Sequence, residues 1–219
     1  LASTAPGTKL WINFDPDGTI SLNNRAEALN DIIVLDLSGE RESLVDKFLV
    51  ENPLGLDKFL PEHPEITTII IDSISEFAMR ALMHGVTKIH NTNGTQPTFE
   101  DPGQQGYGRR LNITYKMVHN MLKITAKHKR NIIFITHEKA VNDKQGVMKY
   151  ISLRLGGTLN SDVPQQISEV WHISDIAKVG RVIAIRPYGL HKPMKSRMFH
   201  MPKIARFLWT YDADTLKGE

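Results

Sequence analysis

Acidic side chains follow two apolar stretches of the sequence at the point where each stretch ends. Residues 66–72 read ITTIIID, so an apolar run ends in the carboxylate of Asp72, and Ser73 follows. A carboxylate at the carboxyl end of a strand offers a hard oxygen ligand for a magnesium ion that bridges phosphates. Strands also end in Asp for solubility or because the side chain caps the next helix, and this simpler interpretation of Asp72 stays open.

A second acidic pair follows an earlier apolar stretch, KLWINF at residues 9–14. The sequence continues Asp15-Pro16-Asp17-Gly18, which places two carboxylates two residues apart ahead of a glycine. Such a pair can position a water molecule or support a metal ion. The same composition is common in ordinary turns, so a turn without chemistry is the alternative.

Two further groups are candidates for contact with phosphate. His137 follows the apolar stretch NIIFIT at residues 131–136, where a polar side chain can contact a terminal phosphate and report its loss to the next loop. Lys195 and Arg197 are separated by one residue, so in an extended segment they point to the same side and can bind a phosphate held by a neighbouring subunit. The alternatives are an ordinary strand end and a solvated basic turn.

Strand-like and helix-like patterns alternate along the chain, which predicts an α/β fold with a largely parallel central sheet flanked by helices. Strands are expected over residues 9–14, 31–37, 66–71 and 131–136, with antiparallel additions near the C-terminus at 169–173, 181–186 and 207–211. Helices are expected over residues 40–50, 73–83 and 109–129, the last with an apolar stripe of Leu111, Tyr115, Val118 and Leu122. Residues 90–108 and 138–157 have the composition of long functional or mobile loops.

Length and composition fit one domain over residues 1–219, with ordinary hydrophobic (41%) and charged (23%) fractions. No apolar run approaches the roughly 20 residues that span a bilayer, and no secretory leader opens the chain, so a cytoplasmic protein without a membrane partner is expected. The absence of cysteine excludes disulfides and thiolate metal sites. The net charge of +3 is compatible with nucleic-acid binding but does not decide it.

Taken together and in order, these features resemble the RecA-like P-loop ATPases. Within that class the chain is most similar to the phage-type nucleotide-binding proteins that include RecA-like single-strand-annealing recombinases. KLWINFDPDG, ITTIIIDS and NIIFITHE resemble the family's strand ending in an acidic pair, its Walker B strand and its sensor strand. RLGG, PQQISEVWH and KSR, which begin at residues 154, 164 and 195, resemble the later loop, strand and paired Lys and Arg fingers. The resemblance covers most of the chain, and the order of the motifs is more specific than any one motif.

The resemblance implies a RecA-like core that binds ATP and Mg²⁺. Asp72 and Ser73 would contact the nucleotide, and Asp72 would hold the metal through water. Asp17 stands where the family usually has a glutamate that polarises the attacking water, with Asp15 as the reserve candidate. His137 stands at the phosphate-sensor position.

The resemblance also implies partners. Lys195 and Arg197 would act on the ATP of a neighbouring subunit, which requires a homo-oligomeric ring or filament. Single-stranded DNA would contact the loops after Asp72 and His137. The second loop offers cations and one aromatic side chain suited to backbone contact and base stacking, namely Lys139, Lys144, Lys149, Tyr150 and Arg154. A phage-encoded protein of this kind would act in the host cytoplasm, in recombination by single-strand annealing.

No GxxxxGK[ST] phosphate-binding loop occurs in the 219 residues. The family pattern places it immediately before Leu1, so the sequence is expected to lack its Walker A segment. Three hypotheses stay open: an ATPase stimulated by DNA, a non-catalytic RecA-fold module that binds DNA or a partner, and a helicase or other DNA motor of the same fold. The residues upstream of Leu1 would separate the first two, and directional strand displacement would identify the third.

Overall fold

The computed structural model describes residues 2–18, 30–39, 45–46, 53–89, 96–176, 180–187, 189–190, 194–197, 206–209, 211–212 and 217–218. The chain divides into two compact units, Ala2–Thr136 and His137–Glu219. This division does not test the expectation of one domain over residues 1–219, which stays a prediction. Within the described ranges, no helix combines the length and the apolar character needed to cross a membrane.

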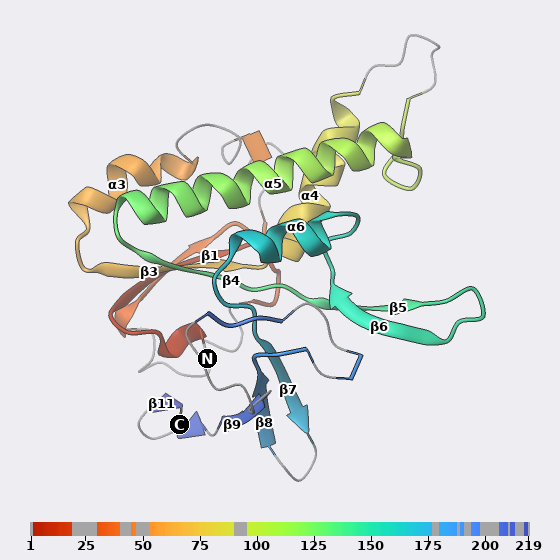
Figure 1. The fold of residues 1–219 in the computed structure, drawn as a ribbon. Coiled ribbons are helices and arrows are strands. Elements are labelled where there is room, and N and C mark those ends of the chain that lie inside the picture. Colours follow the sequence, from red (N-terminus) through yellow and green to blue (C-terminus); the bar gives the residue numbers. More distant parts are fainter. Residues whose placement is uncertain are drawn as a thin grey trace. The chain divides into compact units, whose positions relative to one another are not determined.

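A four-stranded parallel sheet forms the centre of the first unit, in the order β2-β1-β3-β4 (Figure 1). Its strands are β1 (Thr8–Asn13), β2 (Ile32–Asp36), β3 (Ile66–Asp72) and β4 (Asn131–Phe134). β3 lies between two neighbours and buries Ile69, Ile70 and Ile71 completely. This burial explains its continuous apolar run, because a strand covered on both faces has no polar side to alternate. The structure confirms the predicted α/β class and the parallel sheet.

Three helices lie on one side of this sheet: α3 (Leu56–Glu62), α4 (Ile74–Thr87) and α5 (Gly103–Lys127) (Figure 1). Short 3-10 turns cover Ala2–Thr4 and Pro53–Gly55. α4 begins directly after β3, as predicted, and α5 packs against α4. α3 was not predicted. The helix expected over residues 40–50 lies outside the described residues, apart from a helical turn at Val45 and Asp46.

Helix α5 begins six residues earlier than the predicted start at Arg109. The loop predicted over residues 90–108 is therefore wrong from Gly103 onward, and residues 90–95 lie outside the described part. One of the glycines that indicated a loop, Gly106, has a packing role instead. A Cβ atom on Gly106 would lie 2.8 Å from the Cβ of Pro102 and 3.2 Å from a methyl group of Val86, so the start of α5 approaches α4 closely.

The predicted apolar stripe of α5 is also only partly correct. Val118 is buried, Leu111 and Leu122 are half-buried, and Tyr115 is 43% exposed. The buried face instead follows Ile113, Met117, Met121 and Ile124. Both sets have helical spacing, and they occupy adjacent faces of one helix.

The second unit contains a hairpin of β5 (Glu138–Asn142) and β6 (Met148–Leu153) where a long loop was predicted over residues 138–157. The Asp143 carboxylate accepts hydrogen bonds from the backbone N–H groups of Gln145 and Val147, both at 2.9 Å, and closes the turn. The loop prediction was wrong because this stretch mixes lysines with apolar residues and shows no regular strand alternation.

Helix α6 (Leu159–Gln166), which was not predicted, follows the hairpin. An antiparallel sheet in the order β7-β8-β9 comes next, formed by β7 (His172–Ile176), β8 (Gly180–Ala184) and β9 (Arg206–Trp209). A short pair of β10 (Tyr211–Asp212) and β11 (Lys217–Gly218) completes the described elements. The predicted antiparallel additions near the C-terminus are thus confirmed.

Candidate functional site at the carboxyl edge of the parallel sheet

Three polar side chains form a row across the carboxyl ends of neighbouring strands. Asn13, the last residue of β1, lies in register with Asp36 at the end of β2 and with Asp72 at the end of β3. Residues that are in register on adjacent strands share a face of the sheet, so the three side chains project from one face at one edge. The sequence analysis identified Asp72 but missed Asn13 and Asp36, although Asp36 also ends an apolar run.

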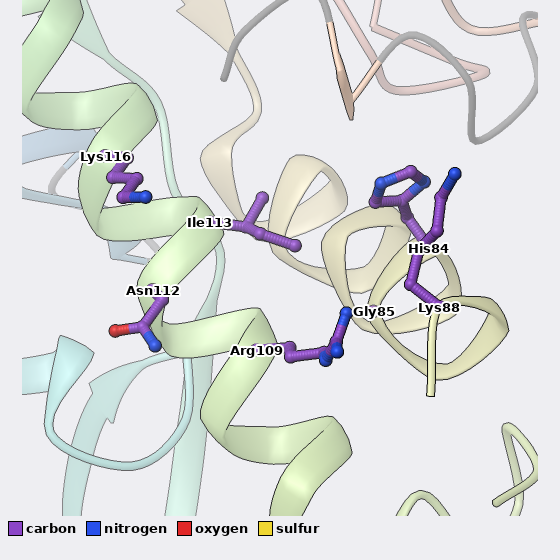
Figure 2. A pocket seen from close by; sticks show the side chains of 7 residues that line it. All are labelled: His84, Gly85, Lys88, Arg109, Asn112, Ile113 and Lys116. Carbon is purple, nitrogen blue, oxygen red and sulfur yellow. The ribbon is translucent and has the colours of Figure 1, made fainter. Parts of the chain in front are cut away.

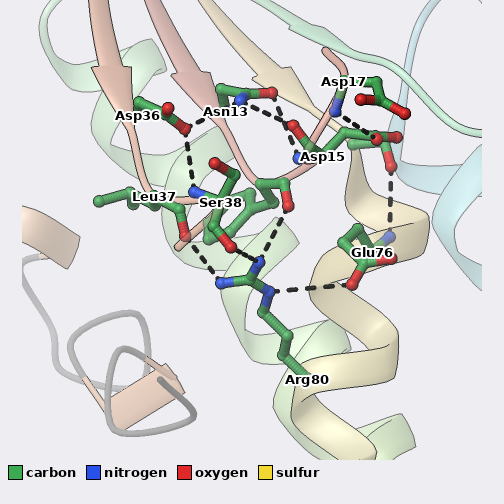
Figure 3. Close-up of polar contacts among 10 residues, drawn as sticks. Asn13, Asp15, Asp17, Asp36, Leu37, Ser38, Glu76 and Arg80 are labelled. Carbon is green, nitrogen blue, oxygen red and sulfur yellow. Dashed lines mark hydrogen bonds and ion pairs between the residues drawn. The ribbon is translucent and has the colours of Figure 1, made fainter. Parts of the chain in front are cut away.

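Asn13 is fully buried (0% exposed) and connects this row to the turn that follows β1. Its Nδ2 donates to Asp36 Oδ1 at 2.9 Å and to the carbonyl oxygen of Asp15 at 2.8 Å (Figure 3). Its Oδ1 accepts a 3.2 Å hydrogen bond from the backbone N–H of Asp15. A buried amide with these partners fixes the path of the turn, because any shift would leave it unsatisfied.

The turn after β1 lies against the end of β3. The backbone N–H groups of Phe14 and, at 3.3 Å, Asp15 donate to the carbonyl oxygen of Asp72. A Cβ atom on Gly18 would overlap Asn13 Oδ1 and would lie 3.2 Å from Asp72 Oδ2, so this glycine passes directly over the row. Asp72 is 8% exposed, in keeping with this close approach.

Helix α4 starts at the other side of Asp72. The peptide bond between Asp72 and Ser73 is cis, and the Ser73 hydroxyl accepts a 3.2 Å hydrogen bond from the backbone N–H of Glu76. Ser73 is therefore the N-cap of α4. The simpler interpretation, in which Asp72 caps the helix, is therefore wrong, because Ser73 has this role.

Arg80 on α4 holds the loops after β1 and β2 together. It is 8% exposed, and its guanidinium donates to the carbonyl oxygens of Leu37 at 2.7 Å, Phe14 at 3.0 Å and Ser38 at 2.7 Å (Figure 3). Glu76 lies 3.9 Å from the same guanidinium. Arg80 was not predicted from the sequence, because one arginine in an amphipathic helix gives no signal of a buried role.

The carboxylate of Asp36 is stabilised in its ionised form. Hydrogen bonds from the backbone N–H and hydroxyl groups of Ser38 lower the pKa of Asp36 below its ordinary value, and the amide of Asn13 and the charge of Arg80 lower this pKa further. The row therefore carries a negative charge at its β2 end at neutral pH.

The strand order places this edge at a topological switch point. From β1 the chain continues to β2 on one side of the sheet, whereas β3 and then β4 lie on the other side of β1. Connections that leave neighbouring parallel strands in opposite directions open a crevice at their carboxyl ends, where ligands bind in open α/β sheets. In this sheet, the two strands at the switch point are β1 and β3, and Asp15 and Asp72 lie at their carboxyl ends.

The first unit brings together four of the predicted site residues: Asp15, Asp17, Asp72 and Ser73. Asp15 is half-buried against the end of β3, whereas Asp17 is exposed and its backbone N–H donates to Asp15 Oδ1 at 3.4 Å. Of the two candidate carboxylates, the reserve candidate Asp15 is thus the one that the turn holds beside Asp72.

The second unit contains the remaining predicted residues. His137 is exposed, and its carbonyl oxygen accepts a 2.8 Å hydrogen bond from the backbone N–H of Arg154. The predicted DNA-contacting residues are all exposed on the hairpin and its ends: Lys139, Lys144, Lys149, Tyr150 and Arg154. The strand register places Lys139 and Tyr150 on one face of the hairpin, and Lys149 lies at an irregularity of the register.

Lys195 and Arg197 lie in a segment that is tied to the residues after α6. Lys195 forms a backbone bridge with Val170, and its Nζ donates to the carbonyl oxygen of Gln165 at 3.3 Å. Burial and the neighbouring charge of Arg197 lower the pKa of Lys195, against the opposite effect of Glu169. Glu169 Oε1 also accepts a 2.7 Å hydrogen bond from the backbone N–H of Arg197, whose side chain is exposed.

The oxygen donors at the sheet edge suit a hard cation. Among the described residues, no group of three or more His, Asp or Glu side chains is arranged to hold a metal ion. Mg²⁺ usually takes one or two carboxylates and completes its shell with water and substrate phosphates. Asp72 fits this type of site, whereas the hydroxyl of Ser73 is buried and serves as the cap of α4.

Comparison with known proteins does not identify the site. The sequence matches no protein-family model and no curated protein. The assignment of the site therefore rests on the row of Asp36, Asn13 and Asp72 and on its position in the sheet.

Proposed function

We propose that this protein is a RecA-like ATPase that acts on single-stranded DNA, with its nucleotide at the carboxyl ends of β1 and β3. The observation that carries this proposal is the register of Asp72 with Asn13 at the switch point of a parallel sheet. The order of the motifs along the chain supports the choice of the RecA-like class among α/β folds.

Each residue of the edge has a role in this proposal. Asp72 holds the metal side of the nucleotide, and Ser73, as the buried cap of α4, positions it. Mg²⁺, when bound, neutralises charge on the phosphates. Asp15 orients the attacking water, with the exposed Asp17 as a second carboxylate on the same turn. Asn13 acts as a positioning residue, because its amide fixes that turn.

The second unit supplies the coupling to other molecules. His137 senses the terminal phosphate, and Lys195 and Arg197 act on the ATP of a neighbouring subunit in a ring or filament. The hairpin contacts single-stranded DNA. Its exposed lysines and Tyr150 support this role. Cationic side chains that contact the DNA backbone and an aromatic side chain that stacks on bases bind single strands without reading their sequence.

The test is ATP hydrolysis with and without single-stranded DNA. The full-length natural protein is used in every assay. We expect Mg²⁺-dependent hydrolysis that DNA stimulates, that Asp72→Ala abolishes and that the exposed-acid control Asp101→Ala leaves unchanged. Unchanged turnover in Asp72→Ala would rule out the metal-binding role of Asp72.

Two other outcomes would replace the proposal. DNA binding without any hydrolysis by the wild-type protein would make it a non-catalytic binding module. Directional strand displacement coupled to hydrolysis would make it a helicase or another DNA motor.

A further inference from the structure

Helix α5 carries basic residues along its length and has no Asp or Glu between Gly103 and Lys127. Arg109, Lys116 and Lys123 follow one another at intervals of seven residues, all three exposed. Seven residues make about two turns of an α-helix, so these cations form a line along one face. A basic line without interspersed acids differs from an ordinary solvated helix face, which mixes both charges.

A pocket between α4 and α5 adjoins the N-terminal end of this line (Figure 2). It is open, measures about 190 Å³ and is lined by His84, Gly85, Lys88, Arg109, Asn112, Ile113 and Lys116. A Cβ atom on Gly85 would lie 2.9 Å from the Cβ of Arg109. The glycine therefore allows the two helices to approach closely where the base of Arg109 passes α4.

Within the described part of the chain, the cations of this surface have no acidic partner. Among the residues that the structure describes, no ion pair involves Lys88, Arg109, Lys116 or Lys123. Other basic groups of the same helices are paired: His84 lies 2.9 Å from Asp46, and Lys127 lies 2.7 Å from Asp57.

Helix stability does not account for the line. Cations near the C-terminal end of a helix stabilise its dipole, which explains Lys88 and Lys127. Arg109 and Lys116 lie in the first and middle parts of α5, where the dipole gives a cation no advantage.

An exposed aromatic residue accompanies the cations. Tyr115 is 43% exposed and lies one turn from Asn112 and from His119, both of which are exposed on the same side of α5. Cations that follow a backbone together with an aromatic platform are the combination that binds single-stranded nucleic acid.

We infer that Lys88, Arg109, Lys116, Lys123 and Tyr115 form a binding surface for single-stranded nucleic acid, here called the α5 basic face. The cations contact phosphates, and Tyr115 stacks on a base. This surface goes beyond the proposed ATPase, because it needs neither nucleotide nor the β5–β6 hairpin.

The test measures binding of a fluorescently labelled single-stranded oligonucleotide by anisotropy, over a salt series and without ATP. Lys116→Gln and Lys123→Gln are made singly and together, and Lys58→Gln on α3 is the control for loss of one exposed lysine. Each α5 substitution should weaken binding and reduce the slope of log affinity against log salt by about 0.7. Tyr115→Ala should weaken binding without changing this slope.

The control should keep the wild-type affinity and slope. Wild-type binding by the double α5 variant would overturn the inference. Equal loss with Lys58→Gln would also overturn it, since net charge alone would then explain the effect. Preference for duplex DNA, with no effect of Tyr115→Ala, would contradict the single-stranded ligand.

A hairpin variant separates this inference from the proposed function. If Lys149→Ala with Arg154→Ala abolishes binding while the α5 variants bind normally, the inference fails and the hairpin site stands. If only the α5 variants lose binding, the inference holds and the hairpin is removed as the DNA contact.

Discussion

Asn13 lies in register with Asp72 on the neighbouring strand, yet it gives both of its amide hydrogens to other partners. One goes to Asp36 at 2.9 Å and the other to the carbonyl oxygen of Asp15 at 2.8 Å. A primary amide has two donors, so none remains for Asp72. The two carboxylates beside Asn13 are therefore not equivalent: Asp36 belongs to the hydrogen-bonded scaffold, and Asp72 ends the strand at the switch point.

This difference predicts opposite results for two matched substitutions. Asp72→Asn should lower Mg²⁺-dependent ATP turnover by about 10- to 100-fold, the range for losing an outer-shell partner of a metal. Asp36→Asn should keep most of the turnover, because its amide oxygen can still accept hydrogen bonds from Ser38 and Asn13. Steady-state hydrolysis by the two variants checks the prediction, and equal losses would show that the row acts as a unit.

A pair of glycine substitutions tests how closely the first turn covers the row. An added methyl group on Gly18 would overlap Asn13 Oδ1 and approach Asp72, whereas no described residue lies within 4 Å of one on Gly39 after β2. Gly18→Ala should weaken nucleotide binding and lower the melting temperature, and Gly39→Ala should change neither measurably. Calorimetric titration with ATP and thermal unfolding provide the measurements. Normal binding by Gly18→Ala would show that the turn can move away.

The buried guanidinium of Arg80 should contribute strongly to stability. Arg80→Met removes three hydrogen bonds to backbone carbonyl groups, and we expect the free energy of unfolding to fall by about 3 kcal/mol. Lys123→Met, an exposed cation on α5, should change it by less than about 0.5 kcal/mol. Urea unfolding followed by circular dichroism gives both values, and a loss of similar size in both variants would contradict the scaffold role.

The ion pairs of Asp57 should make the stability of the protein depend on pH. Hydrogen bonds from Lys127, at 2.7 and 2.8 Å, and the ring of His128, at 2.7 Å, lower the pKa of Asp57 below its ordinary value of 3.8. Its contribution is therefore complete above pH 3.8, where the carboxyl group is ionised in both states. It is lost as the pH falls through the lower pKa of the folded state. The stability difference between the wild type and Asp57→Asn should shrink only below pH 3.8. A difference that is independent of pH would exclude this ion-pair contribution.

Arg197 tests the role of a neighbouring subunit. Arg197→Ala should reduce ATP turnover of the assembled protein by about 10³-fold, as removal of an arginine finger does, while ATP affinity stays unchanged. Lys58→Ala, an exposed cation on α3 outside the proposed sites, is the control for charge loss. Sedimentation must confirm that both variants assemble equally. Full turnover by assembled Arg197→Ala would refute action in trans.

Strands β1 and β3 of the first unit were predictable because each is a buried apolar run that ends at a polar residue of the candidate site. β3 ends at Asp72, as the run ITTIIID indicates, and the helix after it begins where predicted. The hydrogen-bond network of the site was not predictable. Asn13 reads as an unremarkable polar residue in the strand sequence, and its role appears only when parallel pairing places it between two carboxylates.

The errors had local causes. Gly103 and Gly106 predicted a loop, but Gly106 packs closely against Val86 of α4, and this contact overrides its low helix propensity. Tyr115 fitted an apolar stripe at helical spacing, but the neighbouring face with Ile113 and Met117 packs inward. Sequence periodicity alone does not choose between two adjacent faces that are both partly apolar.

The shared register of Asn13 also limits how this chain can change in length. Side chains alternate along a strand, so one inserted or deleted residue within β1 would turn Asn13 to the opposite face and bring Trp11 out of line with Ile70. Viable insertions in this part of the protein should therefore fall in the connections after Gly18 or before Thr8. Within the strand, a substitution at residue 12 would keep the two-residue spacing between Trp11 and Asn13. An insertion or deletion there would change this spacing.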